Sequence, residues 1–170
     1  MARSRTVAAY ERSTRSTTLA ALPEPIRAAV LERADASQLT LAPDAEAYLT
    51  TSRRLAKPGL LGRLTGTADK DSEHLTAMVL GAKDILVATH GEHRGTAVLA
   101  ARLEDVEVGS SVDRLDLDGV AIEREGVTVT GFPVAVEGSA GRGSFFVGLG
   151  APDGEAARAA LDAAVRRAKA

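Results

Sequence analysis

The stretch from Leu75 to His90, LTAMVLGAKDILVATH, consists of two apolar runs on either side of a short polar break. Runs of this length, separated by Gly, Lys and Asp, are typical of two β-strands joined as a hairpin. We therefore expect strands over residues 75–80 and 85–90, with residues 81–84 as the connection.

Further short strands are expected between this hairpin and Leu149. Residues 96–103 alternate, with Ala97, Leu99, Ala101 and Leu103 on one face, and residues 126–131 show the clearest alternation of apolar and polar positions. Residues 138–143 are rich in glycine and predict a loop, and residues 144–149 predict the last strand.

The chain then changes from strand to helix patterning. From Asp153 to Lys169 the sequence is rich in alanine, and its apolar positions form a narrow helical stripe, made of Ala157, Leu161, Ala164, Val165 and Ala168. Asp153 is expected to cap the N-terminus of this helix. Small side chains on the stripe would let the helix approach a sheet closely.

The first forty residues have a different character. Residues 1–18 are polar and predict a tail or a loosely docked helix. The segment after Pro23 predicts a helix whose apolar stripe includes Ile26, Val30 and Leu31 with Ala29 and Ala34. Residues 45–53 could be helix or strand, and we favour a strand because Tyr48, Thr50 and Thr51 prefer that conformation. These patterns suggest an N-terminal tail and helical extension over 1–40 and a second region over 41–170.

Composition restricts the function. The 170 residues contain no Cys and no Trp, and aromatic residues make up 3%. Disulfides, thiol chemistry and Cys-based zinc sites are therefore excluded, and nucleic-acid binding by base stacking is not expected. No apolar run approaches the length of a membrane span, and no secretory signal is evident, so we expect a cytoplasmic protein.

The net charge of −2 is unevenly distributed. Residues 1–70 hold 11 Lys and Arg against 7 Asp and Glu, whereas residues 71–170 hold 10 against 16. An ordinary solvated surface would explain this asymmetry, and so would a basic N-terminal side that meets an anionic partner.

A meander of about seven short strands followed by one C-terminal helix resembles the pleckstrin-homology-like (PH-like) and GRAM-like domains of bacteria. The segments LTAMVLGAKDILVAT, VLAARLEDVEV and FFVGLGAPDGEAARAALDAAV carry this resemblance, which covers roughly residues 45–170. It implies an α+β fold, a small antiparallel β-barrel capped by the C-terminal helix. The Trp that is usual in the closing helix of pleckstrin-homology domains is missing here.

Residues 52–63 are the best candidate for a binding site. In lipid-binding members of the PH-like superfamily, the loop between the first two strands often holds cations for the headgroup. Here the possible anion ligands are Arg53, Arg54, Lys57 and Arg63, and the possible membrane contacts are Leu60 and Leu61. Arginine forks suit phosphate, and the leucines could enter the headgroup region. Alternatively, the leucines pack against the first helix and the cations are solvated.

Other motifs have weaker support. His90, Glu92 and His93 could bind a divalent metal, but we favour an ordinary polar turn and predict no metal site. The glycine-rich segment Gly138 to Ser144 lacks the Lys of a phosphate-binding loop and precedes a strand. We predict no cofactor.

The sequence thus predicts a non-catalytic binding or scaffolding module. Its partner is expected to be a protein or a second copy of the chain, and not nucleic acid. The alternative is peripheral binding to anionic membrane lipid through residues 52–63.

Overall fold

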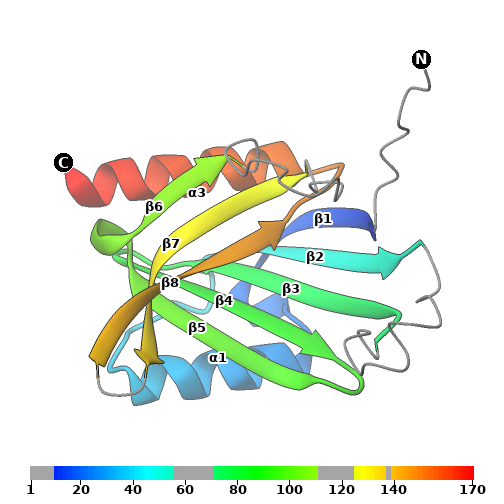
Figure 1. Cartoon of the computed structure of the whole chain (residues 1–170), viewed down its shortest axis with the longest axis horizontal. Coiled ribbons are helices and arrows are strands. Elements are labelled where there is room, and N and C mark those ends of the chain that lie inside the picture. Colours follow the sequence, from blue (N-terminus) through cyan, green and yellow to red (C-terminus); the bar gives the residue numbers. More distant parts are fainter. Residues whose placement is uncertain (1–9, 56–70, 111–124, 137–138) are drawn as a thin grey trace.

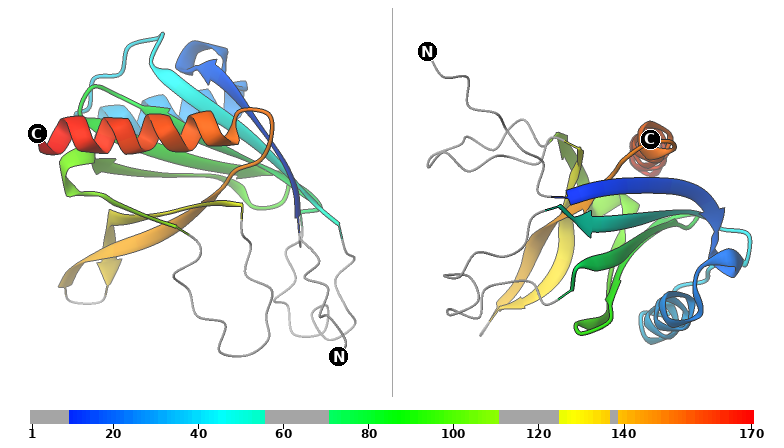
Figure 2. Two further views of the ribbon diagram at one scale, coloured as in Figure 1. Left: turned by 90° about the horizontal axis from the view of Figure 1, so that it is seen from above. Right: turned by 90° about the vertical axis from the view of Figure 1, so that its right-hand side faces the viewer.

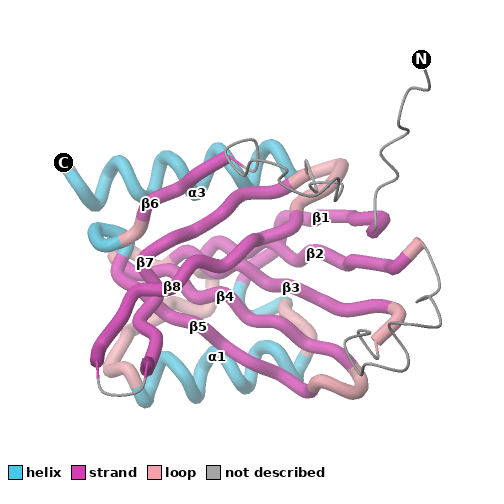
Figure 3. The backbone as a smooth tube through the Cα atoms, in the orientation of Figure 1, coloured by secondary structure: helices cyan, strands magenta, loops and turns pink. Residues whose placement is uncertain are grey.

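The computed structural model describes residues 10–55, 71–110, 125–136 and 139–170, and β-strands make up most of them (Figure 3). In chain order the elements are β1 (Tyr10–Thr18), a 3-10 turn (Leu19–Ala21), α1 (Glu24–Ala36), β2 (Glu46–Arg54), β3 (Glu73–Leu80), β4 (Asp84–Gly91), β5 (Gly95–Arg102), a second 3-10 turn (Leu103–Asp105), β6 (Glu107–Ser110), β7 (Gly126–Val136), β8 (Ser139–Gly148) and α3 (Gly154–Lys169).

The described strands form two antiparallel sheets (Figure 1). One has five strands in the order β1-β2-β3-β4-β5, and the other has three in the order β6-β7-β8. The predicted α+β class, the hairpin of β3 and β4, the strand choice for residues 45–53 and the C-terminal helix are confirmed. The described strands do not close into a barrel. Seven of them, β2 to β8, lie after residue 40, where about seven were expected, and β1 is additional.

The centre of the five-stranded sheet, at β3 and β4, is buried on both faces. Its outer face packs against α1, with the side chains of Ala47, Ala77, Val79, Leu86, Ala88 and Ala100. Its inner face packs against the three-stranded sheet and α3, with Tyr48, Met78, Leu80, Ile85, Val87 and Ala101. Burial on both sides explains why the sequences of β3 and β4 are continuous apolar runs and not alternating ones.

Among the described residues, α1 and α3 lie far apart with strands between them (Figures 1 and 2). On α1, Ile26, Val30 and Ala34 are buried as the helical stripe predicts, whereas Leu31 is exposed. On α3, the predicted stripe is confirmed, since Ala157, Leu161, Ala164 and Val165 are buried, with Ala168 packed beside them. Leu161 is fully buried among side chains from both sheets.

The prediction of a tail or loose helix over residues 1–18 is wrong for Tyr10–Thr18. These residues form β1, which pairs with β2 along its whole length, from Tyr10 opposite Arg54 to Thr18 opposite Glu46. β1 is therefore part of the same sheet as β2, and α1 packs against that sheet.

The prediction of a loop over residues 138–143 is wrong for 139–143, which belong to β8 and pair with β7. Gly143 lies opposite Phe132, and a Cβ there would stand 2.7 Å from Cγ1 of Val134. Glycine is needed here for close packing and not for a turn.

The capping prediction for Asp153 is also wrong. Asp153 occupies the N-cap position of α3, but its side chain makes no capping hydrogen bond. Its Oδ2 instead accepts a hydrogen bond from the backbone N–H of Ser16 in β1, at 2.7 Å. The N–H of Thr14 donates to the carbonyl of Ala151, and the N–H of Asp153 donates to the carbonyl of Thr14. The turn before α3 thus covers the free edge of β1 and shields it from pairing with another chain.

Candidate functional site

The inner face of the five-stranded sheet changes from apolar to polar along its strands. Tyr48 of β2 and Met78 of β3 lie in the apolar core. Two residues away on each strand, the same face carries Thr50 and Thr76, which lie opposite each other. Since alternate residues of a strand share a face, the next positions are Ser52 and His74. One end of this face therefore consists of groups that can form hydrogen bonds.

A row of four threonines crosses this part of the sheet. Thr14 lies opposite Thr50, Thr50 opposite Thr76, and Thr76 opposite Thr89, one from each of β1 to β4. Thr14 and Thr50 are almost completely buried, and their hydroxyls form a hydrogen bond of 2.8 Å. Thr14 Oγ1 also accepts a hydrogen bond from the N–H of Gly150. We call these four residues the threonine row.

The next row contains Arg12, Ser52 and His74. Arg12 lies opposite Ser52, and Ser52 lies opposite His74. Residues from both rows, together with part of β8, line a cavity of about 280 Å³ that is open to solvent. Its polar lining residues are Arg12, Ser52, His74, Thr76, Thr89 and Arg94, and the others are Tyr10, Phe145, Phe146 and Gly148. We call this space the polar cavity.

Aromatic rings hold Arg12 in place. Its guanidinium carbon lies 5.2 Å from the ring centre of Tyr10 and 5.8 Å from that of Phe146, both within the range of a cation–π interaction. Tyr10 also meets the ring of His74 edge to face, with centroids 5.4 Å apart. Gly148 is required beside Arg12, because a Cβ there would overlap Arg12 Nε.

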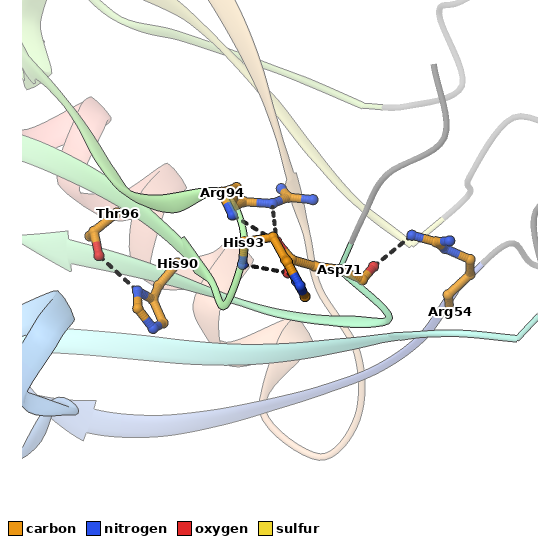
Figure 4. Close-up of polar contacts among 6 residues, drawn as sticks. All are labelled: Arg54, Asp71, His90, His93, Arg94 and Thr96. Carbon is orange, nitrogen blue, oxygen red and sulfur yellow. Dashed lines mark hydrogen bonds and ion pairs between the residues drawn. The ribbon is translucent and has the colours of Figure 1, made fainter. Parts of the chain in front are cut away.

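Arg94 reaches the cavity from the turn between β4 and β5, and Asp71 fixes that turn (Figure 4). The Asp71 side chain is almost completely buried, and each of its oxygens accepts two hydrogen bonds. The N–H and Nδ1 of His93 bind Oδ1, at 2.8 and 2.9 Å, and the N–H and Nε of Arg94 bind Oδ2, each at 3.2 Å. We call Asp71 with His93 and Arg94 the Asp71 clamp.

The clamp stabilises the ionised carboxylate. The backbone N–H of His93 makes the largest contribution, and the His93 ring and the two donors of Arg94 add to it, while burial opposes them. Together they lower the pKa of Asp71 to about 2. Gly91 makes room for this arrangement, since a Cβ at that position would overlap Asp71 Oδ2.

The structure separates the two predicted arginines that it describes. Adjacent residues of a strand point to opposite faces, so Arg53 and Arg54 at the end of β2 diverge. Arg53 is exposed and forms an ion pair with Glu73 at 3.3 Å. Arg54 Nη2 donates to the backbone oxygen of Asp71 at 2.6 Å (Figure 4). The remaining predicted ligands and contacts, Lys57, Leu60, Leu61 and Arg63, lie outside the described residues.

The histidines of the turn have separate partners. His90 Nδ1 forms a hydrogen bond of 2.7 Å with the hydroxyl of Thr96, whereas His93 is part of the Asp71 clamp (Figure 4). Within the described ranges, no three His, Asp or Glu side chains gather in positions that could hold a metal ion.

Sequence reasoning missed the polar cavity because its residues come from five distant segments. The available signal was a polar residue at every second position in Arg12-x-Thr14, Thr50-x-Ser52 and His74-x-Thr76. In an isolated sequence this pattern is the same as that of a solvent-facing strand.

Comparison with family models, curated proteins and solved structures finds no match for this chain. None of the described helices is long and apolar enough to cross a membrane. The functional argument therefore depends on the geometry of this chain alone.

Proposed function

We propose that this chain is a non-catalytic binding module of PH-like architecture that binds a ligand in the polar cavity. Antiparallel strands in two sheets, followed by one helix against the inner core, support the PH-like assignment. PH-like folds serve many different functions, so the function has to be inferred from the residues of the site and not from the fold.

The observation that carries the proposal is the polar end of the inner face. Ser52 and Thr76 are 2% and 6% exposed, and they lie between two sheets, where apolar side chains pack best. Burial of polar groups costs free energy unless they are hydrogen-bonded, so polar groups kept around a cavity indicate a ligand that binds there.

The lining also supports a non-catalytic role. Ser52 and His74 are cross-strand neighbours, and the lining combines guanidinium, imidazole and hydroxyl groups. Such groups can recognise a polar ligand by hydrogen bonds without any covalent step.

The test is a titration of the isotope-labelled protein with phosphate, choline, glucose and indole, followed by amide chemical shifts. We expect at least one probe to shift the amides of Arg12, Ser52 and His74 together, with smaller changes on α1. The proposal is wrong if every probe leaves these amides unchanged, or if the protein hydrolyses p-nitrophenyl acetate or p-nitrophenyl phosphate and S52A abolishes that activity.

Association with a protein or with a second copy stays a prediction, as does binding of anionic lipid through residues 52–63. The described exposed large apolar residues are Leu31, which lies on α1, and Leu55, which directly follows β2. Arg53 and Arg54 both have acceptors nearby, in Glu73 and Asp71. Light scattering would detect self-association, and vesicle sedimentation in a salt series would detect lipid binding.

A further inference from the structure

We propose that the ligand group held in the polar cavity is a phosphate, bound principally by Arg12. This inference rests on the function proposed above and specifies its ligand class. The phosphate could be free, part of a soluble ester or part of a lipid headgroup, since the recognising chemistry is the same in each case.

The hydrogen-bond donors of the lining suit an anion. Arg12 and Arg94 contribute guanidinium groups, and Arg94 is also paired with the carboxylate of Asp71. A guanidinium is always protonated in proteins, and its planar fork matches a pair of phosphate oxygens.

The number of donors favours phosphate over a carboxylate. Besides the two arginines, the lining holds the imidazole of His74 and the hydroxyls of Ser52, Thr76 and Thr89. A carboxylate offers two oxygens, whereas a phosphate monoester offers three strong acceptors that can accept from several sides. Hydrogen bonds with one charged partner are also stronger than neutral ones.

Arg12 is positioned before any ligand arrives. The rings of Tyr10 and Phe146 lie beside its guanidinium, at 5.2 and 5.8 Å, and Gly148 leaves space for it. A positioned arginine loses less side-chain entropy on binding than a mobile one. Arg94 is held in a similar way through its Nε bond to Asp71.

The cavity has a suitable size. One water molecule takes up about 30 Å³ in the liquid, so about 280 Å³ accommodates a phosphate and the first atoms of its ester group. The threonine row separates this space from the apolar core that holds α3.

The experiment measures binding of inorganic phosphate and glycerol 3-phosphate to the full chain by isothermal titration calorimetry. We expect R12Q to weaken binding by about tenfold or more, as loss of a charge-assisted hydrogen bond does. The matched control is R15Q, because Arg15 lies on the same strand, is exposed and points to the opposite face. R15Q should bind as the unaltered protein does.

A second variant covers the case in which R12Q fails to fold. T89V keeps the side-chain volume and removes one lining hydroxyl, and it should weaken phosphate binding by a few-fold. Thermal melting of each variant reports whether it is folded before binding is measured.

Vesicles separate the possible sources of the phosphate. If phosphatidylcholine vesicles that contain phosphatidic acid bind the protein and R12Q abolishes this, while the soluble probes do not bind, the ligand is a headgroup. If the soluble probes bind in an Arg12-dependent way, the ligand is a free phosphate or a soluble ester.

Three results would overturn the proposal: no binding of either soluble probe or of the vesicles, equal binding by R12Q and the unaltered protein, or tighter binding of acetate than of phosphate. The proposed function would survive any of these if choline, glucose or indole shifted the amides of Arg12, Ser52 and His74. The proposed function would also be wrong if neither phosphate nor choline, glucose or indole shifted these amides.

Discussion

The carboxylate of Asp153 accepts a hydrogen bond of 2.7 Å from the backbone N–H of Ser16, which lies 137 residues earlier in the chain. This bond replaces the helix cap that the position of Asp153 would suggest. It joins the first strand to the start of the last helix, so a side chain expected to act locally makes a long-range contact.

We predict that D153A lowers the free energy of unfolding by about 1 kcal/mol, since a charge-assisted hydrogen bond to a backbone N–H is lost. Urea unfolding followed by circular dichroism measures this. The control is E155Q, because Glu155 is an exposed acid in the first turn of α3, whereas the acceptor for the Ser16 N–H is Asp153. Equal stability of D153A and the unaltered protein would contradict the prediction.

Thr14 should be sensitive to loss of its hydroxyl. T14V removes the partner of Thr50 Oγ1 and of the Gly150 N–H while it keeps the side-chain shape. Buried groups left without a partner cost about 1–3 kcal/mol, and we expect a loss of stability in that range. T17V, on the opposite face of β1, should change stability by less than about 0.5 kcal/mol. The same urea titration compares them, and similar losses in both would be evidence against a role of the hydroxyl.

Asp71 should make the protein sensitive to acid. Its pKa falls from 3.8 to about 2 on folding, so the folded state binds fewer protons than the unfolded one in this interval. The stability that Asp71 contributes is therefore complete above the unfolded pKa and is lost as the pH falls through the folded pKa.

D71N should flatten the dependence of stability on pH between about 4 and 2, and it should also lower stability at neutral pH. Urea midpoints measured over this pH range test the prediction. D35N, at an exposed position near the end of α1, should keep the unaltered slope. An unaltered slope in D71N would show that the clamp does not contribute.

Leu161 anchors α3 in the inner core. L161A should cost about 2–5 kcal/mol, because removal of a fully buried leucine leaves a cavity. The matched control is L31A, which makes the same change on the other helix at a side chain that is 45% exposed, and it should cost less than about 0.5 kcal/mol. Thermal melting compares the two, and comparable costs would contradict the assigned role of α3.

The sequence predicted those elements whose apolar residues are the ones buried in the structure. The β3–β4 hairpin is flanked by apolar layers on both sides, so its apolar runs could only be buried strands. The stripe on α3 follows the helical period and is buried as expected.

β1 was missed because its sequence, YERSTRSTT, has no apolar face. One of its faces lines the polar cavity with Arg12, and the other is largely exposed at Glu11, Ser13 and Arg15. The polar cavity was missed for the same reason, since it combines side chains that are remote in sequence. Only the register between strands brings Arg12, Ser52 and His74 into one row.

The hydrogen bonds between β1 and the turn before α3 have a consequence for synthesis of the chain on the ribosome. Thr14 obtains two of its backbone hydrogen bonds from Ala151 and Asp153, which are translated after every strand of both sheets. Until these residues emerge, the nascent sheet has an open edge that can pair with a neighbouring nascent chain. Premature termination before residue 150 would therefore leave a product that can add strands from other molecules.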